Sequence, residues 1–196
     1  MTICYIDTET SGLNPYKHQP LTAAFKVVID GKTVETKELS FGLMDSSVID
    51  DKALEANGLT RTEIKKFPSC MQTYEELKAF LGRFVNPYLK TDKMIFAAYN
   101  ARFDYDMLRA LFERLGDRYF GSWFWFPPLD IMNTAMDALQ ADRAKLSDFK
   151  LGTVARFLGV EVDKSKLHGA LYDIELAIEV YHKSQELIAR RFNSHD

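Results

Sequence analysis

Cysteine is scarce in this chain of 196 residues, which contains only Cys4 and Cys70. Two cysteines are too few for a disulfide framework or a four-cysteine zinc site, so we expect a protein of a reducing compartment. Glycine and proline are also few, with 10 and 6 residues. This excludes a collagen-like chain and a chain dominated by linkers.

Long hydrophobic runs are absent as well. No apolar run approaches the roughly 20 residues that cross a bilayer, and the first residues carry no basic segment of a targeting peptide. We therefore expect a soluble, cytoplasmic protein that does not contact membranes. The positive charge typical of proteins that coat duplex nucleic acid is missing too, because the formal net charge is −3. An enzyme that grips only the end of a strand remains compatible with this charge.

The composition is otherwise that of a globular protein. Hydrophobic residues make up 46% and charged residues 27%, which excludes wholesale disorder. A domain has roughly 100–200 residues, and no linker interrupts the chain, so we expect a single domain over residues 1–196.

The hydrophobic periodicity predicts strands first, then strands and helices in alternation. A hairpin is indicated by Asp30-Gly31 between two strand-like runs. The expected fold class is α/β, a mixed sheet covered by helices. The strands are predicted over 2–7, 21–29, 33–43 and 94–98, and the helices over 103–115, 151–158 and 171–188.

Two local patterns concern element boundaries and aromatic side chains. Capping-box spacing places helix starts at Thr60, three residues before Glu63, and at Thr73, three residues before Glu76. The run Trp123–Phe126 belongs to an awkward strand or a loop over 123–129 that ends in two prolines. Packing in the core is favoured for these aromatics over a stacking surface for single strands.

Asp7 and Glu9 lie two residues apart at the end of the first predicted strand. Residues i and i+2 of a strand share one face, so the two carboxylates are expected side by side. Adjacent carboxylates repel each other, and a divalent cation would relieve that repulsion. Oxygen ligands select hard ions such as Mg²⁺ or Mn²⁺. A solvated strand end is the alternative explanation of this short motif.

Two later segments supply further acidic residues and a histidine. Asp104 stands where the strand 94–98 gives way to a helix, a position at which carboxylates also cap helices, and Asp106 is a neighbour of similar character. Asp173 follows His168 by five residues near the start of the last helix. Five helical residues turn through about 140°, so both side chains reach one site only if His168 precedes the helix.

Three segments together resemble, in order, the exonuclease motifs of the DnaQ-like 3′–5′ exonucleases of the DEDDh type, which belong to the ribonuclease-H-like superfamily. The segments are DTETSGL, YNARFDYDML and HGALYDIELAIEVY. The resemblance runs from Asp7 to about Tyr181. Two positions depart from the family pattern, since Tyr99 and Asn57 stand where the family often has histidine.

The resemblance implies a ribonuclease-H-like sheet whose first strands are antiparallel and whose later strands are parallel. It also implies a four-carboxylate site for two divalent cations, Mg²⁺ or Mn²⁺, formed by Asp7, Glu9, Asp104 and Asp173. Asp7 would bridge the ions, and Asp104 would act on the second ion. His168 would be the general base that takes the proton of the attacking water, a role suited to its ordinary pKa near 6.5.

The resemblance also implies contacts with substrate. Thr8, Thr10 and Leu13 match positions that hold the terminal nucleotide, and Asn100 belongs to the second motif. Leu59 and Phe103 match positions that wedge or stack on terminal bases, although plain core packing explains these two equally well.

The implied activity is release of nucleoside 5′-monophosphates from the 3′ end of nucleic acid. Single-stranded DNA is favoured, because few residues follow the last helix and we expect no tail for docking onto a polymerase. RNA trimming of the oligoribonuclease kind is the alternative within enzymes, since ribose selection depends on 2′-OH contacts. A catalytically inactive nucleic-acid-binding module on the same fold is the alternative from another class.

Overall fold

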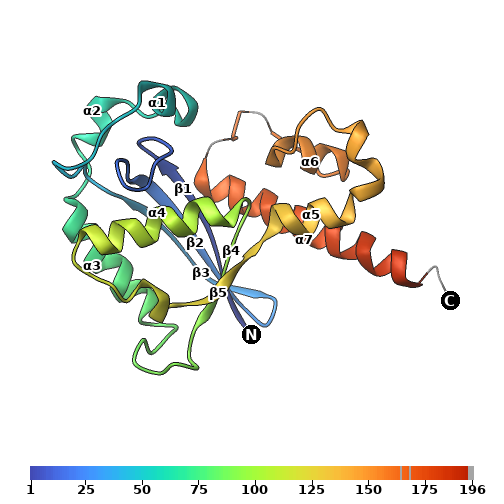
Figure 1. Cartoon of the computed structure of the whole chain (residues 1–196), viewed down its shortest axis with the longest axis horizontal. Coiled ribbons are helices and arrows are strands. Elements are labelled where there is room, and N and C mark those ends of the chain that lie inside the picture. Colours follow the sequence, from blue (N-terminus) through green and yellow to red (C-terminus); the bar gives the residue numbers. More distant parts are fainter. Residues whose placement is uncertain (164, 168, 194–196) are drawn as a thin grey trace.

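A five-stranded mixed sheet forms the centre of the protein, and the computed structural model describes residues 1–163, 165–167 and 169–193 (Figure 1). The strand order is β3-β2-β1-β4-β5. The strands are β1 (Thr2–Thr10), β2 (Pro20–Ile29), β3 (Lys32–Ser40), β4 (Met94–Ala98) and β5 (Phe124–Asp130). The helices are α1 (Asp51–Asn57), α2 (Arg61–Ile64), α3 (Cys70–Leu81), α4 (Ala101–Arg114), α5 (Ile131–Ala138), α6 (Leu151–Phe157) and α7 (Ala170–Asn193), with 3-10 turns at Phe120–Ser122 and Gln140–Lys145.

The pairing pattern confirms the expected fold class. β1 pairs antiparallel with β2 and β2 antiparallel with β3, whereas β1 pairs parallel with β4 and β4 parallel with β5. The predicted hairpin is also confirmed, because Asp30 and Gly31 adopt φ values of 47° and 80° between β2 and β3. Two positive φ values in succession match the tight turn that the right-handed twist of paired strands prefers.

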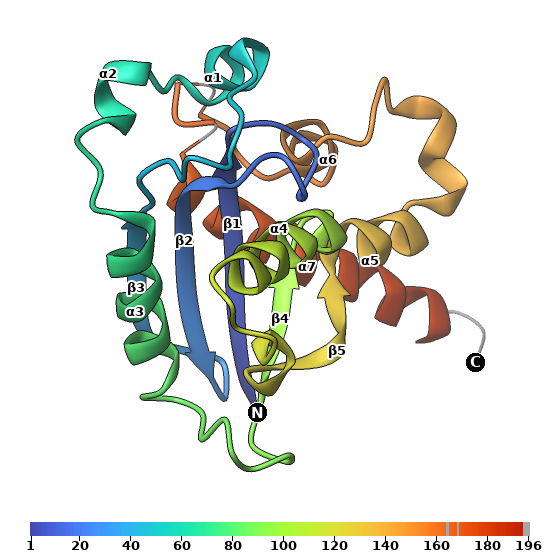
Figure 2. The same ribbon diagram turned by 60° about the vertical axis from the view of Figure 1, so that its left-hand side comes forward.

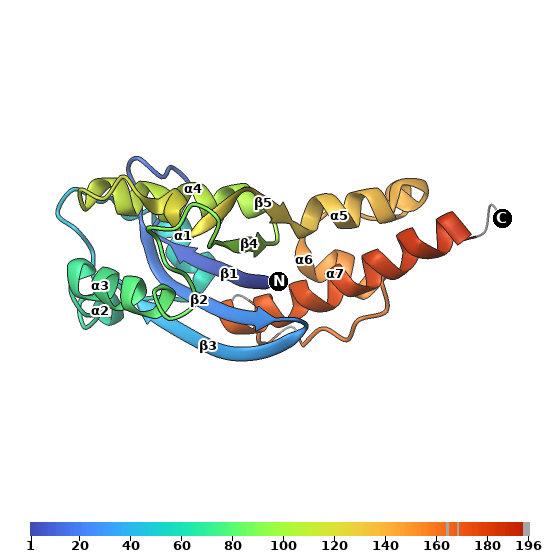
Figure 3. The same ribbon diagram turned by 90° about the horizontal axis from the view of Figure 1, so that it is seen from below.

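Each face of the sheet carries its own layer of helices. Cys4 and Ile6 of β1 pack in a core with α3 and α4, whereas Ile3 and Tyr5 pack in a core with α5, α6 and α7. This alternation follows from the two-residue period of a strand. Figure 2 shows α3 and α4 in front of the strands and α7 behind them. Figure 3 shows α5 and α7 extending together beyond the sheet towards the C-terminus.

Aromatic rings fasten α4 to the strands beneath it. The ring centroid of Phe96 in β4 lies 5.3 Å from that of Tyr105 in α4 and 5.2 Å from that of Phe124 in β5. Both ring pairs are nearly edge to face. Edge-to-face rings gain energy beyond the area they bury. The run Trp123–Phe126 divides, since Trp123 and Phe124 are buried while Trp125 and Phe126 are 43% and 72% exposed.

Element boundaries agree with the sequence in most places and differ in a few. The capping box at Thr60 and Glu63 is confirmed, but the predicted helix start at Thr73 is wrong. α3 begins three residues earlier, capped by Ser69, and the Thr73 hydroxyl donates instead to the Ser40 carbonyl at 2.7 Å. The segment at 124–130 is a strand despite its prolines, which an edge strand tolerates. In the part of the chain with described coordinates, no helix has the length and apolarity needed to span a membrane.

Candidate active site

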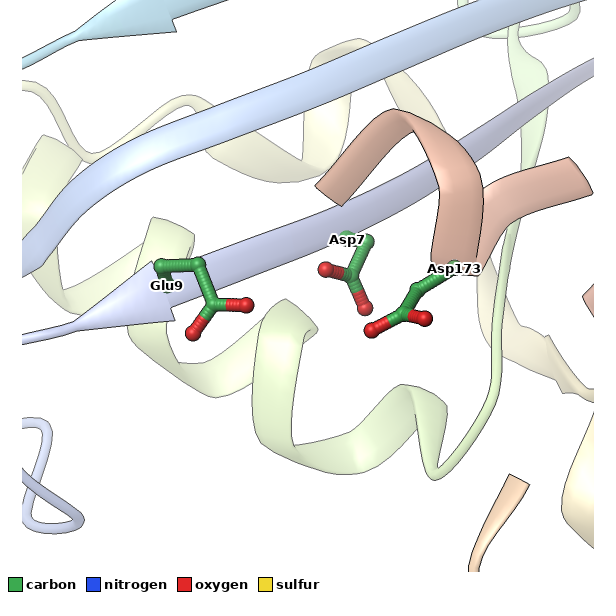
Figure 4. Close-up of side chains that lie close together, drawn as sticks. All are labelled: Asp7, Glu9 and Asp173. Atoms are coloured by element: carbon green, nitrogen blue, oxygen red, sulfur yellow. The ribbon is translucent and has the colours of Figure 1, made fainter. Parts of the chain in front are cut away.

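Three carboxylates meet where the carboxyl-terminal half of β1 passes the first turn of α7. Asp7 and Glu9 continue the row of Ile3 and Tyr5 on the face that α7 covers. Asp173 comes from the first turn of α7. One carboxylate oxygen from each of Asp7, Glu9 and Asp173 lies within 4.8 Å of the others (Figure 4).

Burial and mutual repulsion make Asp7 and Glu9 reluctant to ionise. Burial raises the pKa of Asp7 well above its ordinary value, and the charges of Asp104, Glu9 and Asp173 raise it further. Burial likewise raises the pKa of Glu9 to about 8, with contributions from Asp173 and Asp104. Without a cation, the cluster therefore holds protons that ordinary carboxylates lose.

Asp104 reaches the same region from the opposite face of the sheet. It lies in the first turn of α4 and is 4% exposed. Its Oδ1 accepts hydrogen bonds from the Thr8 amide at 3.0 Å and the Thr8 hydroxyl at 2.7 Å. Thr8 points towards α4 because it alternates with Asp7 and Glu9 along β1. Burial raises the pKa of Asp104 to about 7, although the Thr8 hydrogen bonds act in the opposite direction.

The turn that presents Asp104 depends on Asp130, a residue that was not among the predicted site residues. Asn100 adopts the left-handed conformation, with φ 63° and ψ 49°, between β4 and α4. The backbone amide of Asn100 donates to Asp130 Oδ1 at 3.2 Å. The same carboxylate oxygen caps α5, because it also accepts from the Met132 backbone amide at 3.0 Å. Asp130 also raises the pKa of Asp104 through its charge. The sequence signal that could have identified Asp130 is its position, because it is a carboxylate directly after the segment 123–129.

A divalent cation fits the three converging carboxylates. Oxygen donors held within a few ångströms of one another form the ligand set of hard ions such as Mg²⁺ and Mn²⁺. The raised pKa values of Asp7 and Glu9 fit this role, because a cation would offset the repulsion that burial intensifies.

The remaining predicted site residues differ in their exposure and in what they contact. The Thr10 hydroxyl donates to the Gly12 carbonyl at 2.9 Å, and Leu13 is 79% exposed just after β1. Leu59 packs beside the small core of Leu21, Leu54 and Ile64, the arrangement expected of a core residue. Phe103 is half-buried and Asn100 exposed at the start of α4. His168 lies outside the described residues.

The side-chain amides of half-buried Asn57 and buried Gln19 hold nearby loops in place, and the sequence did not identify either residue as a support of the site. Asn57, the last residue of α1, donates from Nδ2 to the Thr10 carbonyl at 3.1 Å and so ties α1 to the end of β1. Gln19 is fully buried and accepts from Met44 N at 2.9 Å and donates to the Gly42 carbonyl at 3.1 Å. The loops around the carboxylates are therefore fixed by internal hydrogen bonds.

A spacious hollow on the described surface has none of the three carboxylates in its lining. It measures about 890 Å³ and is lined mainly by apolar residues of the 42–49 loop, α2 and the start of α3. Volume alone would make it the default ligand site. The clustered acidic groups with perturbed pKa values instead make the end of β1 the candidate active site.

Comparisons with known proteins identify the family of the chain. A family model described as Exonuclease matches residues 4–181. A PolC-type DNA polymerase III of Mycoplasmopsis pulmonis is 23% identical over 176 residues, which are 89% of this chain and 11% of the polymerase.

Solved structures of E. coli exonuclease I share the fold. The complex with a dT13 oligonucleotide has a TM-score of 0.76 at 19% identity and covers 98% of this chain and 43% of its own. The zinc-bound complex with single-stranded DNA has a TM-score of 0.74 at 20% identity, with the same coverage of both chains. This chain thus spans less than half the length of those relatives. The match over residues 4–181 shows that the chain belongs to the exonuclease family.

Proposed function

We propose that the protein is a metal-dependent 3′–5′ exonuclease that releases nucleoside 5′-monophosphates from single-stranded DNA. The observation that carries the proposal is the convergence of Asp7, Glu9 and Asp173, whose carboxylate oxygens lie within 4.8 Å of one another. Membership of the exonuclease family supports it. The substrate is suggested by the structurally similar exonuclease I, whose structure holds a dT13 oligonucleotide.

The carboxylates would hold two divalent cations. Asp7, Glu9 and Asp173 would bind one ion, and Asp7 and Asp104 would hold the second. When bound, such ions supply positive charge that stabilises the negative transition state of phosphodiester hydrolysis. Thr8 donates two hydrogen bonds to one oxygen of Asp104, so the other oxygen would be the one that binds the ion.

The proton of the attacking water would go to His168. This residue precedes Asp173 by five positions in the chain, and its role is proposed from the resemblance of its motif. An imidazole titrates near operating pH and therefore accepts a proton without a large energetic cost. The proton-transfer role predicts that His168→Ala lowers turnover by about 10²–10⁴-fold.

Substrate positioning would come from the loop and helix that frame the cluster. The backbone between Thr8 and Leu13 borders the carboxylates, and Phe103 lies on the first turn of α4 beside Asp104. A flat apolar ring next to a strand end can stack on a base of any sequence. Phe103→Ala should therefore raise KM for oligonucleotides more than it lowers kcat.

The test is a product ladder from labelled oligonucleotides. Single-stranded DNA, duplex DNA and RNA, each labelled at either the 5′ or the 3′ end, are incubated with the protein and Mn²⁺. Successive shortening of 5′-labelled DNA, with mononucleotide released from 3′-labelled DNA, supports the proposal. Asp7→Asn should abolish the ladder, whereas Asp30→Asn, which changes an exposed aspartate in the turn between β2 and β3, should retain it. Preferred shortening of RNA would contradict the DNA assignment, and binding without cleavage would indicate a non-catalytic module.

A further inference from the structure

The loop that follows β1 is held in one shape by its own hydrogen bonds. The Ser11 amide donates to the Gln19 carbonyl at 2.9 Å, and the Gln19 amide donates to Ser11 Oγ at 3.1 Å. Between them, the Asn14 carbonyl accepts from the amides of Lys17 and His18 at 3.0 and 2.8 Å. Such a closed loop presents its side chains in fixed positions.

Two large apolar side chains of this loop point into solvent. Leu13 is 79% and Tyr16 82% exposed, although the Tyr16 amide is fixed by a hydrogen bond to Asn14 Oδ1 at 2.9 Å. One exposed aromatic residue is common on protein surfaces and indicates no function by itself. The significance of Tyr16 depends on what lies beside it.

Tyr16 forms one wall of a groove whose other wall is α4. The groove has a volume of about 340 Å³. Figures 1 and 2 both show the loop after β1 lying beside α4. We call this groove the Tyr16 groove. Its lining residues are Pro15, Tyr16, Arg102, Asp106, Arg109, Ala110 and Glu113.

The two arginines of the groove are exposed and only weakly engaged. The side chains of Arg102 and Arg109 are 77% and 58% exposed, and they pair with Asp106 and Glu113 one helical turn further along. Exposed pairs at this spacing contribute little to stability. A phosphate offers a guanidinium two oxygens at once, so it can take over or share these arginines at little cost.

The groove runs along α4, from the turn of the helix that carries Asp104 towards its C-terminal end. Arg102 lies two residues before Asp104 in the first turn of α4, and Glu113 is near the last turn. Eleven residues of helix separate Arg102 from Glu113, which is about 16 Å along the axis. A stacked strand advances about 3.4 Å per nucleotide, so the groove is long enough to hold more than one nucleotide.

We propose, on the basis of the exonuclease function proposed above, that the Tyr16 groove binds the single strand upstream of the nucleotide being removed. A base stacks on the Tyr16 ring, and backbone phosphates contact Arg102 and Arg109. Stacking tolerates every base, and the arginines contact only the backbone, so this binding is independent of sequence.

The test separates strand binding from the chemistry of the carboxylate cluster. KM is measured with a thymidine dodecanucleotide and with the p-nitrophenyl ester of thymidine 5′-monophosphate, which has no upstream nucleotide. The variants are Tyr16→Ala and the double variant Arg102→Gln/Arg109→Gln. The matched controls are Tyr88→Ala, a tyrosine 92% exposed before the start of β4, and Arg190→Gln, an arginine 76% exposed that pairs with Glu186 on α7.

The ratio of the oligonucleotide KM to the ester KM is expected to rise about fivefold or more in Tyr16→Ala, the lower limit for removal of one base stack, and to rise in the double arginine variant as well. It should stay at the wild-type value in both controls. An unchanged ratio in the groove variants, or an equal rise in the controls, would overturn the proposal.

A binding measurement decides the proposal even if the wild-type protein hydrolyses neither substrate. Fluorescence anisotropy of a labelled dodecanucleotide in EDTA gives Kd as a function of salt without turnover. The double arginine variant should lower the salt slope of log K by about 1.4, because each phosphate that is no longer neutralised reduces the slope by about 0.7. Absence of hydrolysis together with this change in slope would refute the exonuclease function and support strand binding in the Tyr16 groove. Equal slopes for the wild type and the double arginine variant would refute strand binding in the groove.

Discussion

In the absence of metal ions, the protein should lose stability as the pH rises from about 6 to about 9, and Glu9→Gln should reduce that loss. Burial and the charges of Asp173 and Asp104 raise the pKa of Glu9 to about 8, whereas an unfolded glutamate titrates near about 4.3. The folded state therefore binds the proton more tightly. Its contribution to the free energy of unfolding is fully present below the unfolded pKa and is lost as the pH rises through the folded pKa.

The magnitude follows from the two pKa values. Each unit of pKa difference corresponds to about 1.36 kcal/mol, so protonation of Glu9 contributes about 2–3 kcal/mol at about pH 6 and almost nothing at about pH 9. For a chain of this length, about 1 kcal/mol changes Tm by about 2–4 °C. Glu9 alone should thus account for a fall of about 5–10 °C in the wild-type protein.

The assay is thermal unfolding in EDTA across this pH range, followed by circular dichroism. Glu9→Gln is compared with Glu55→Gln, which changes an exposed glutamate of α1. The wild-type and Glu55→Gln proteins should show the full fall in Tm, and Glu9→Gln a smaller one. Added Mn²⁺ should raise Tm more at high pH, where the ligands are ionised. Parallel Tm curves for wild type and Glu9→Gln would refute the reasoning.

Three further outcomes are expected. EDTA should stop hydrolysis and excess Mg²⁺ or Mn²⁺ should restore it, so activity that survives chelation would contradict the metal site. Thr8→Val removes the hydroxyl that donates to Asp104 at 2.7 Å. Since that bond lowers the pKa of Asp104, the rising limb of the pH–rate profile should move to higher pH in this variant. An unmoved limb would exclude a role of Thr8 in the ionisation of Asp104. Asn100→Val should destabilise the protein by about 1–3 kcal/mol in urea unfolding because valine tolerates a positive φ poorly, whereas Asn100→Gly should not.

The fold could be predicted from the sequence to the extent that local patterns carry it. Alternating hydrophobicity and the Asp30-Gly31 turn identified the β2–β3 hairpin, because a tight turn between strands is a local property. The start of α3 could not be predicted in the same way. The Thr73 hydroxyl is engaged by the Ser40 carbonyl, a contact between residues 33 positions apart.

The candidate site divides along the same line. Asp7 and Glu9 could be placed together from strand geometry, and Asp104 and Asp173 entered through the resemblance of their motifs. The orientation of Asp104 could not be foreseen, because it depends on which face of β1 Thr8 occupies and on packing of α4 against β4. Asp130 was missed for a related reason, since its role requires β5 to lie beside β4.

The pairing of β1 with its neighbouring strands determines how substitutions far from the carboxylates can affect the proposed activity. The strand has assigned partners in β2 from Thr2 to Thr10 and in β4 from Ile3 to Tyr5. A slip of one residue would turn Asp7 and Glu9 into the aromatic layer under α4 and aim the Thr8 hydroxyl at α7. We therefore expect that substitutions inside β2 or β4, remote from the carboxylate cluster, can abolish the proposed hydrolysis while the fold is retained. An inactive variant in those strands would report misalignment of β1, not the removal of a reactive group.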